Sequence, residues 1–130
     1  MNNQEIYDTV VRHLYEQGHQ ALTKEAGICA YRTARGDKCA VGVLIPDNLY
    51  VPKMEGRACD SLLNKFPALK AMFPDHDALP LLENLQSVHD FENNWDSNGL
   101  SGLGIHELRV AAQDYKLSTE VLDKLYPSRV

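Results

Sequence analysis

Three features are scarce in this chain of 130 residues: cysteine, long apolar runs, and positive charge in the second half. Three cysteines are an odd number at irregular spacing, which favours reduced thiols in a cytosol over a disulfide framework. No apolar run approaches the roughly 20 residues that span a bilayer, and the N-terminal MNNQEIYD lacks the basic and apolar regions of a signal peptide. The sequence therefore predicts a soluble, cytoplasmic protein without a membrane partner.

Positive charge is missing from Ala71 to Leu108, where seven acidic residues stand against no Lys or Arg. The formal net charge of the whole chain is −5. A segment of this sign repels phosphate and suits a basic partner or a cation, so nucleic acid is not an expected ligand. The plainer interpretation is a solvated acidic face that helps solubility.

The residues that are present predict one mainly helical domain over 1–130. Apolar residues are 44% of the chain, close to the globular average. Apolar positions recur at helical spacing in several segments. The predicted helices are one capped by Asn3 and ended by Gly18, one over about 59–66, a short turn at 69–73, one over about 78–93, and a C-terminal helix pair over 104–127.

The stretch from 28 to 56 predicts a short β-hairpin followed by a proline loop. Ile28 to Thr33 is β-prone, Gly36 suits the left-handed position of a turn, and the chain returns from Lys38. This register places Arg32 opposite Lys38, Tyr31 opposite Cys39 and Cys29 opposite Val41. A buried helix beginning at Cys39 is an alternative, since short apolar runs do not separate the two. The predicted fold class is α+β, mainly α, with about five helices packed around one short hairpin.

Motifs in this stretch carry a resemblance to a family. A C-x-Y-R segment at Cys29–Arg32 precedes K-C-A-x-G-x-L-I-P-D-x-x-Y at Lys38–Tyr50 and M-E-G at Met54–Gly56, with L-Q-x-V-H-D at Leu85–Asp90 downstream. In these motifs the chain resembles small uncharacterised proteins of bacteria and phages. The resemblance implies an accessory role, such as a phage or prophage protein that interferes with a host system, and a host or phage protein as partner.

Two further motifs point to structure. The loop from Asn94 nearly matches a calcium-binding loop, but Ile105 stands where a bidentate Glu is needed, so no calcium site is expected. The segment from Ala111 resembles a helix-turn-helix, but Lys116 replaces the turn glycine and Glu120 and Asp123 would face the groove. Because DNA readers need basic and amide side chains there, we interpret the segment as a packing corner between two helices.

Five residues of the central stretch are candidates for ligand binding: Tyr31, Arg32, Asp47, Tyr50 and Glu55. The tyrosines offer flat contact area, and the guanidinium can fork onto a carboxylate or phosphate. The alternative is internal: Arg32 pairs with Glu55 or Asp47 and holds the loop against the hairpin. The predicted function is therefore non-catalytic binding of a protein partner or a small anionic ligand.

A cysteine-dependent hydrolase or transferase is the second hypothesis, with Cys39 as nucleophile, His89 as base and Asp90 or Asp47 as orienting acid. Against it, Cys39 lies in an apolar run, and adjacent helical residues such as His89 and Asp90 point in different directions. Zinc held by the three cysteines and a histidine is disfavoured, because structural zinc ligands come in closely spaced pairs. No metal and no cofactor are expected.

Overall fold

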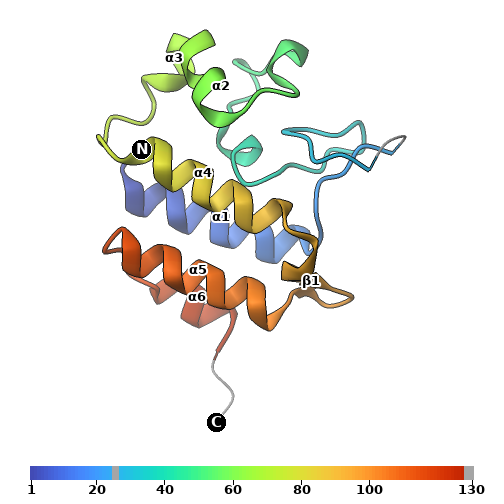
Figure 1. The fold of residues 1–130 in the computed structure, drawn as a ribbon, viewed down its shortest axis with the longest axis vertical. Coiled ribbons are helices and arrows are strands. Elements are labelled where there is room, and N and C mark those ends of the chain that lie inside the picture. Colours follow the sequence, from blue (N-terminus) through green and yellow to red (C-terminus); the bar gives the residue numbers. More distant parts are fainter. Residues whose placement is uncertain (25–26, 128–130) are drawn as a thin grey trace.

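The computed structural model describes residues 1–24 and 27–127 and confirms the mainly helical fold class (Figure 1). The described α-helices are α1 (Asn3–Gln17), α2 (Cys59–Lys65), α3 (Pro67–Lys70), α4 (Ala78–Asp90), α5 (Gly102–Asp114) and α6 (Glu120–Leu125). Short 3-10 turns are η1 (Gly42–Leu44), η2 (Pro52–Met54) and η3 (Glu92–Asn94). Strands β1 (Trp95–Asp96) and β2 (Gly99–Leu100) form an antiparallel pair.

The cap of helix α1 lies one residue before the predicted cap, Asn3. The cap is Asn2, whose side chain accepts a hydrogen bond from the Glu5 amide at 2.8 Å while the Glu5 carboxylate accepts from the Asn2 amide at 3.0 Å. This reciprocal capping box satisfies two amides that have no partner within the helix. Asn3 instead lies in the first turn and donates to Asp77 at 2.7 Å. The predicted end of the helix is confirmed, since Gly18 has a φ of 74°.

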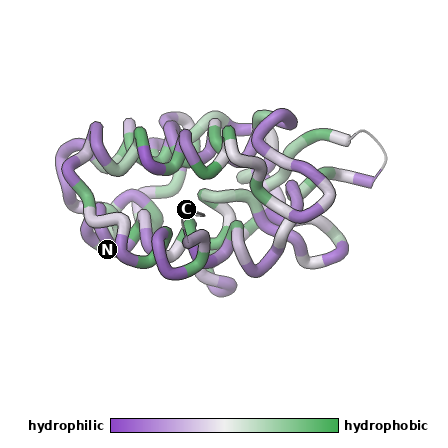
Figure 2. Tube along the Cα trace, turned by 90° about the horizontal axis from the view of Figure 1, so that it is seen from below, coloured by the Kyte–Doolittle hydropathy of each residue, from purple (hydrophilic) through white to green (hydrophobic). Residues whose placement is uncertain are grey.

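Helices α1 and α4 lie side by side at the centre of the molecule, with α5 and α6 below them in Figure 1 and α2 and α3 above. The N-terminal ends of α1 and α4 are joined by the bonds of Asn3 to Asp75 and Asp77. Tyr7 on α1 donates its buried hydroxyl to the Leu108 carbonyl of α5 at 2.8 Å. Hydrophobic and hydrophilic positions alternate along the helical trace in Figure 2, and buried apolar residues of these helices form one core cluster that also includes Cys39, Ala40, Val41, Leu44 and Ile45.

The predicted central hairpin shrinks to a single bridge. Arg32 pairs with Lys38 as predicted, and Gly36 takes a left-handed φ of 92° in the turn. The ladder does not extend in the described residues: Cys29 pairs with Leu22, and the chain after Cys39 turns into η1. At Gly42, the first residue of η1, the chain packs against Tyr31 so closely that a Cβ atom would come within 1.9 Å of the Tyr31 carbonyl oxygen. The returning segment therefore contacts Tyr31 through this turn and not through a strand ladder.

The two-stranded hairpin of the structure is β1–β2, in a segment where the sequence predicted only a loop. Helix α4 ends at Asp90, three residues before its predicted end. The C-terminal helix pair is present as α5 and α6, and Lys116 between them has a left-handed φ of 55°. Among the described helices, none combines the length and apolar character that a membrane crossing needs.

Candidate functional site

The five predicted ligand-binding residues come together in one network centred on Glu55. One carboxylate oxygen of Glu55 accepts the Tyr31 amide at 2.9 Å. The other accepts the Arg32 amide at 3.0 Å and the Tyr50 hydroxyl at 2.6 Å. Three donors from two separate segments thus converge on a single carboxylate. Glu55 takes the place that a partner strand would have beside residues 31 and 32.

The guanidinium of Arg32 is also engaged within the protein. It pairs with the Asp47 carboxylate at 2.9 Å and donates to the Ile45 carbonyl at 2.6 Å. It lies over the Tyr50 ring at 4.6 Å from the ring centre, a cation–π contact. Partial burial and the bond to Glu55 raise the pKa of Tyr50 to about 12. These contacts are the internal pairing that the sequence left as an alternative, and ligand binding by the five residues stays a prediction.

Tyr31 and Glu55 also form part of the wall of a pocket that contains all three cysteines. Its volume is about 340 Å³. We call it the thiol pocket, and its lining residues are Ile28, Cys29, Ala30, Tyr31, Cys39, Glu55, Gly56, Arg57, Ala58, Cys59, Gln86 and Asp90. Segments 28–31 and 55–59 and the C-terminal turn of α4 enclose it. The sequence predicted Cys29 and Cys59 in different elements, and the spacing of the three cysteines did not indicate that they line one cavity.

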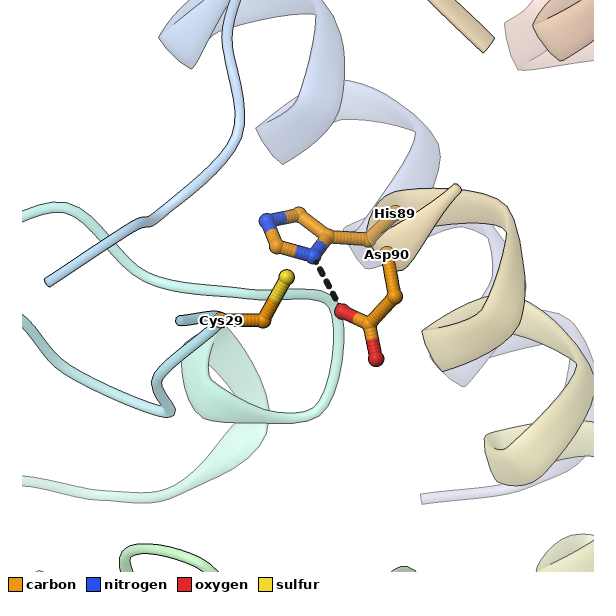
Figure 3. A group of neighbouring side chains, drawn as sticks. All are labelled: Cys29, His89 and Asp90. Atoms are coloured by element: carbon orange, nitrogen blue, oxygen red, sulfur yellow. Dashed lines mark hydrogen bonds and ion pairs between the residues drawn. The ribbon is translucent and has the colours of Figure 1, made fainter. Parts of the chain in front are cut away.

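At one side of this pocket Cys29, His89 and Asp90 converge, with their ligand atoms within 4.8 Å of one another (Figure 3). His89 Nδ1 lies 2.7 Å from the Asp90 carboxylate, so the prediction that these neighbours cannot pair is wrong. Asp90 is the last residue of α4, and its side chain turns back towards the ring of the preceding residue. The thiol in this cluster belongs to Cys29, whereas the sequence analysis chose Cys39.

The hydrogen bonds of His89 fix which of its ring nitrogens carries the proton. The backbone amide of Ala21 donates to Nε2 at 2.9 Å, and an amide can only donate, so Nε2 accepts. Nδ1 therefore carries the proton and donates it to Asp90. Trp95 anchors the residue further by donating its indole N–H to the His89 carbonyl at 2.9 Å. In this arrangement neither ring nitrogen offers a free lone pair to a metal ion or to a thiol proton.

Burial raises the pKa of Cys29, Cys39 and Cys59, each to about 12. The nearby Asp90 carboxylate adds to the rise for Cys29. Cys39 is buried, and its sulfur accepts the Gly42 amide at 3.3 Å. All three side chains are thus neutral thiols at neutral pH, and they present a weakly polar wall instead of a nucleophile.

Asp90 is the polar group that the thiol pocket leaves open. Its Oδ1 accepts both His89 and the Gln86 amide, the latter at 2.8 Å. The Cys29 thiol also hydrogen-bonds to this carboxylate, which contributes to the raised pKa of Cys29. No N–H or O–H group of the described residues donates to Oδ2, and the Asp90 side chain is 42% exposed. Arg57, the cation among the lining residues, donates to the Lys53 carbonyl and to Ser61. A bound molecule therefore meets neutral thiols and one carboxylate oxygen with unused acceptor capacity.

Sequence reasoning identified His89 and Asp90 but missed Gln86 and Arg57. A spacing of four residues on a predicted helix could have linked Gln86 to Asp90. No motif or spacing in the sequence pointed to Arg57.

Comparisons with family models, with curated proteins and with solved structures found no match to this chain. The proposals below therefore depend on the geometry of the site alone.

Proposed function

We propose that the protein binds a small molecule in the thiol pocket without catalysis, and that the ligand carries an ammonium or amidinium group. The observation that carries the proposal is the Asp90 carboxylate, whose second oxygen receives no N–H or O–H donor from the described residues, the weakly donating Cys29 thiol being its neighbour in the pocket. A charged donor on the ligand would form a charge-assisted hydrogen bond there. The accessory role that the family resemblance implies stays a prediction.

The charges around the pocket favour a cationic group over the anionic ligand expected from the sequence. That expectation depended on Arg32, whose guanidinium is now engaged by Asp47, the Ile45 carbonyl and the Tyr50 ring. The lining residues include two acids, Glu55 and Asp90, against the single Arg57. The rest of the wall is thiol and aliphatic, with Ile28 exposed at its rim. A compact apolar body with one cationic end fits this surface.

The proposal is tested with benzamidine, benzylamine and benzoate as probes, observed by protein NMR titration. We expect saturable shifts with the two cations at residues of the thiol pocket, and none with benzoate. Asp90→Asn keeps the shape of the side chain and removes its charge, and should weaken benzamidine binding about tenfold or more. Asp47→Asn is the matched control, because Asp47 is equally acidic but lies outside the pocket. Equal effects of the two variants, or preferential binding of benzoate, would contradict the proposal.

Thiol chemistry at Cys29 is the second candidate, favoured by the convergence of Cys29, His89 and Asp90. The raised pKa of the thiol and the occupied Nε2 of His89 oppose it. Iodoacetamide at neutral pH separates the two functions, since alkylation needs the thiolate. A binding pocket predicts that native Cys29 reacts at least about a hundredfold more slowly than free cysteine. Reaction at the free-cysteine rate, absent from Cys29→Ser, would establish the enzyme candidate instead.

A further inference from the structure

A second hollow lies between α4 and α5, on residues that the thiol pocket does not use. Its volume is about 410 Å³. We call it the α4–α5 groove, and its lining residues are Asn84, Ser87, Val88, Phe91, Asn94, Leu103 and Glu107. Phe91 is 50% exposed and Leu103 is 45% exposed, although both are large and apolar. Two such side chains beside one hollow offer an anchor point for an apolar group of a partner.

The residues that line this groove include one acid and no Lys or Arg. All of them belong to the segment 71–108, which contains seven acids and no Lys or Arg. Glu107 lines the groove itself. The next cation along the chain is Arg109, and its guanidinium pairs with Asp123 at 2.6 Å. A partner with basic residues would meet attraction here, and a phosphate backbone would meet repulsion.

The groove also contains a polar group without its usual partner. Asn94 is 2% exposed, and its Nδ2 donates to the Val88 carbonyl at 2.9 Å. Its Oδ1 accepts no hydrogen bond from the described residues. Gly104 lets α5 approach Asn94 closely, because a Cβ atom there would lie 2.5 Å from the backbone carbonyl oxygen of Asn94. The groove therefore combines apolar surface, acidic charge and an acceptor that lacks a donor.

We propose that the α4–α5 groove binds a basic amphipathic segment of a partner protein. One apolar side chain of that segment packs between Phe91 and Leu103, and flanking Lys or Arg side chains face Glu107 and the acids of the same segment. This is the helix-in-groove mode of peptide recognition, with specificity supplied by charge. It is independent of the thiol pocket, and either site can fail its test without affecting the other.

The test uses a short fluorescein-labelled peptide with leucine at helical spacing on a lysine background, followed by fluorescence polarisation. We expect saturable binding that weakens as salt is raised, and no binding of the same peptide with glutamate in place of lysine. The double variant Phe91→Ser, Leu103→Ser should bind about tenfold or more weakly. Glu107→Gln should weaken binding about threefold and reduce its salt dependence. Val51→Ser is the matched control, since Val51 is 39% exposed and lies outside the groove.

Several results would overturn the proposal. They are absence of saturable binding at low salt, equal binding of the glutamate peptide, or a loss in Val51→Ser as large as in the double variant. Sedimentation velocity of the free protein tests the other occupant: a dimer that the double variant dissociates would assign the groove to a second copy of the chain. Thermal melts accompany each variant. If the double variant is unstable, Glu107→Gln and the salt dependence still decide the question.

Discussion

The substitution Glu55→Gln distinguishes a carboxylate that supports the fold from one reserved for a ligand. It changes one oxygen to an NH₂ group and leaves the volume of the side chain nearly unchanged. In the native protein one oxygen accepts the Tyr31 amide, and the other accepts the Arg32 amide and the Tyr50 hydroxyl. Whichever way the new amide turns, its NH₂ group faces at least one backbone N–H, and two donors cannot bond.

The magnitude follows from counting these bonds. In the better orientation of the amide, the Tyr31 N–H loses its acceptor, which costs about 1.5–3 kcal/mol for a bond to a charged group. The two remaining bonds pass from a charged to a neutral acceptor and weaken. Because the site is only partly buried, we expect a total loss of about 2–3 kcal/mol in the free energy of unfolding. For a chain of this length that corresponds to a fall of roughly 10 °C in Tm.

Urea unfolding followed by circular dichroism measures this loss, and Asp47→Asn is the matched control. Asp47 pairs with Arg32 from a side chain that is 88% exposed, and exposed ion pairs contribute about 0–1 kcal/mol. Glu55→Gln should therefore cost clearly more than Asp47→Asn. If Glu55→Gln unfolds at the wild-type urea concentration, the carboxylate does not hold residues 31 and 32 in place, and the structural interpretation of the network is wrong.

Three further variants test other parts of the fold. Gly42→Ala should lower the free energy of unfolding in urea by about 3 kcal/mol or more, because its Cβ would lie 1.9 Å from the Tyr31 carbonyl oxygen. Gly102→Ala is the control: there is open space around its Cβ, so its stability should remain close to that of the wild type. Lys116→Gly should raise stability by about 0.5–1 kcal/mol, since Lys116 has a left-handed φ of 55° that glycine adopts without strain; a lower Tm would contradict this. Burial raises the pKa of Cys39 from 9.0 to about 12, so the folded state keeps a proton that the unfolded state loses, and stability should fall above pH 9 by up to about 1.4 kcal/mol per pH unit. Urea unfolding at pH 7.5 and at pH 10 measures this loss of stability in the wild type and in Cys39→Ala. The part due to Cys39 should be missing in the variant, and an equal loss in both proteins would refute the assignment.

Local signals in the sequence predicted the helices because those signals act over a few residues. Gly18 and the apolar stripe of α1 fixed that helix to within one residue, since a left-handed cap and helical spacing depend on neighbours in the chain. The single bridge between Arg32 and Lys38 was predicted for the same reason, because Gly36 sets the turn. The hairpin at Trp95–Leu100 was missed, since its two-residue strands are too short to show alternation.

The candidate site could be predicted only in part, because its contacts join distant segments. The five residues of the Glu55 network lie within 25 positions of one another, and the motifs around them drew attention to all five. The choice between Cys39 and Cys29 as the thiol beside His89 depends on contacts between distant segments. Both thiols line the pocket, and their distance from His89 depends on where Ala21 and Cys29 cross the end of α4. No local sequence pattern predicts where these residues cross the helix.

Apart from α4 and the first residue of α2, the walls of the thiol pocket are irregular backbone, and side chains supply the hydrogen bonds that a sheet would supply. Lys38 bonds through its amide and carbonyl to Gln17 of α1, at 2.8 and 2.9 Å, and Gln86 of α4 accepts the Val41 amide at 3.0 Å. Buried backbone groups must find partners, so each of these side chains fixes one piece of the wall. Gln86 also donates to Asp90, which links the position of the wall to the carboxylate proposed to hold the ligand. A ligand that engages Asp90 therefore tightens the same set of bonds that orders residues 31–41. Benzamidine binding should accordingly raise the Tm of the wild type more than that of Asp90→Asn at the same ligand concentration.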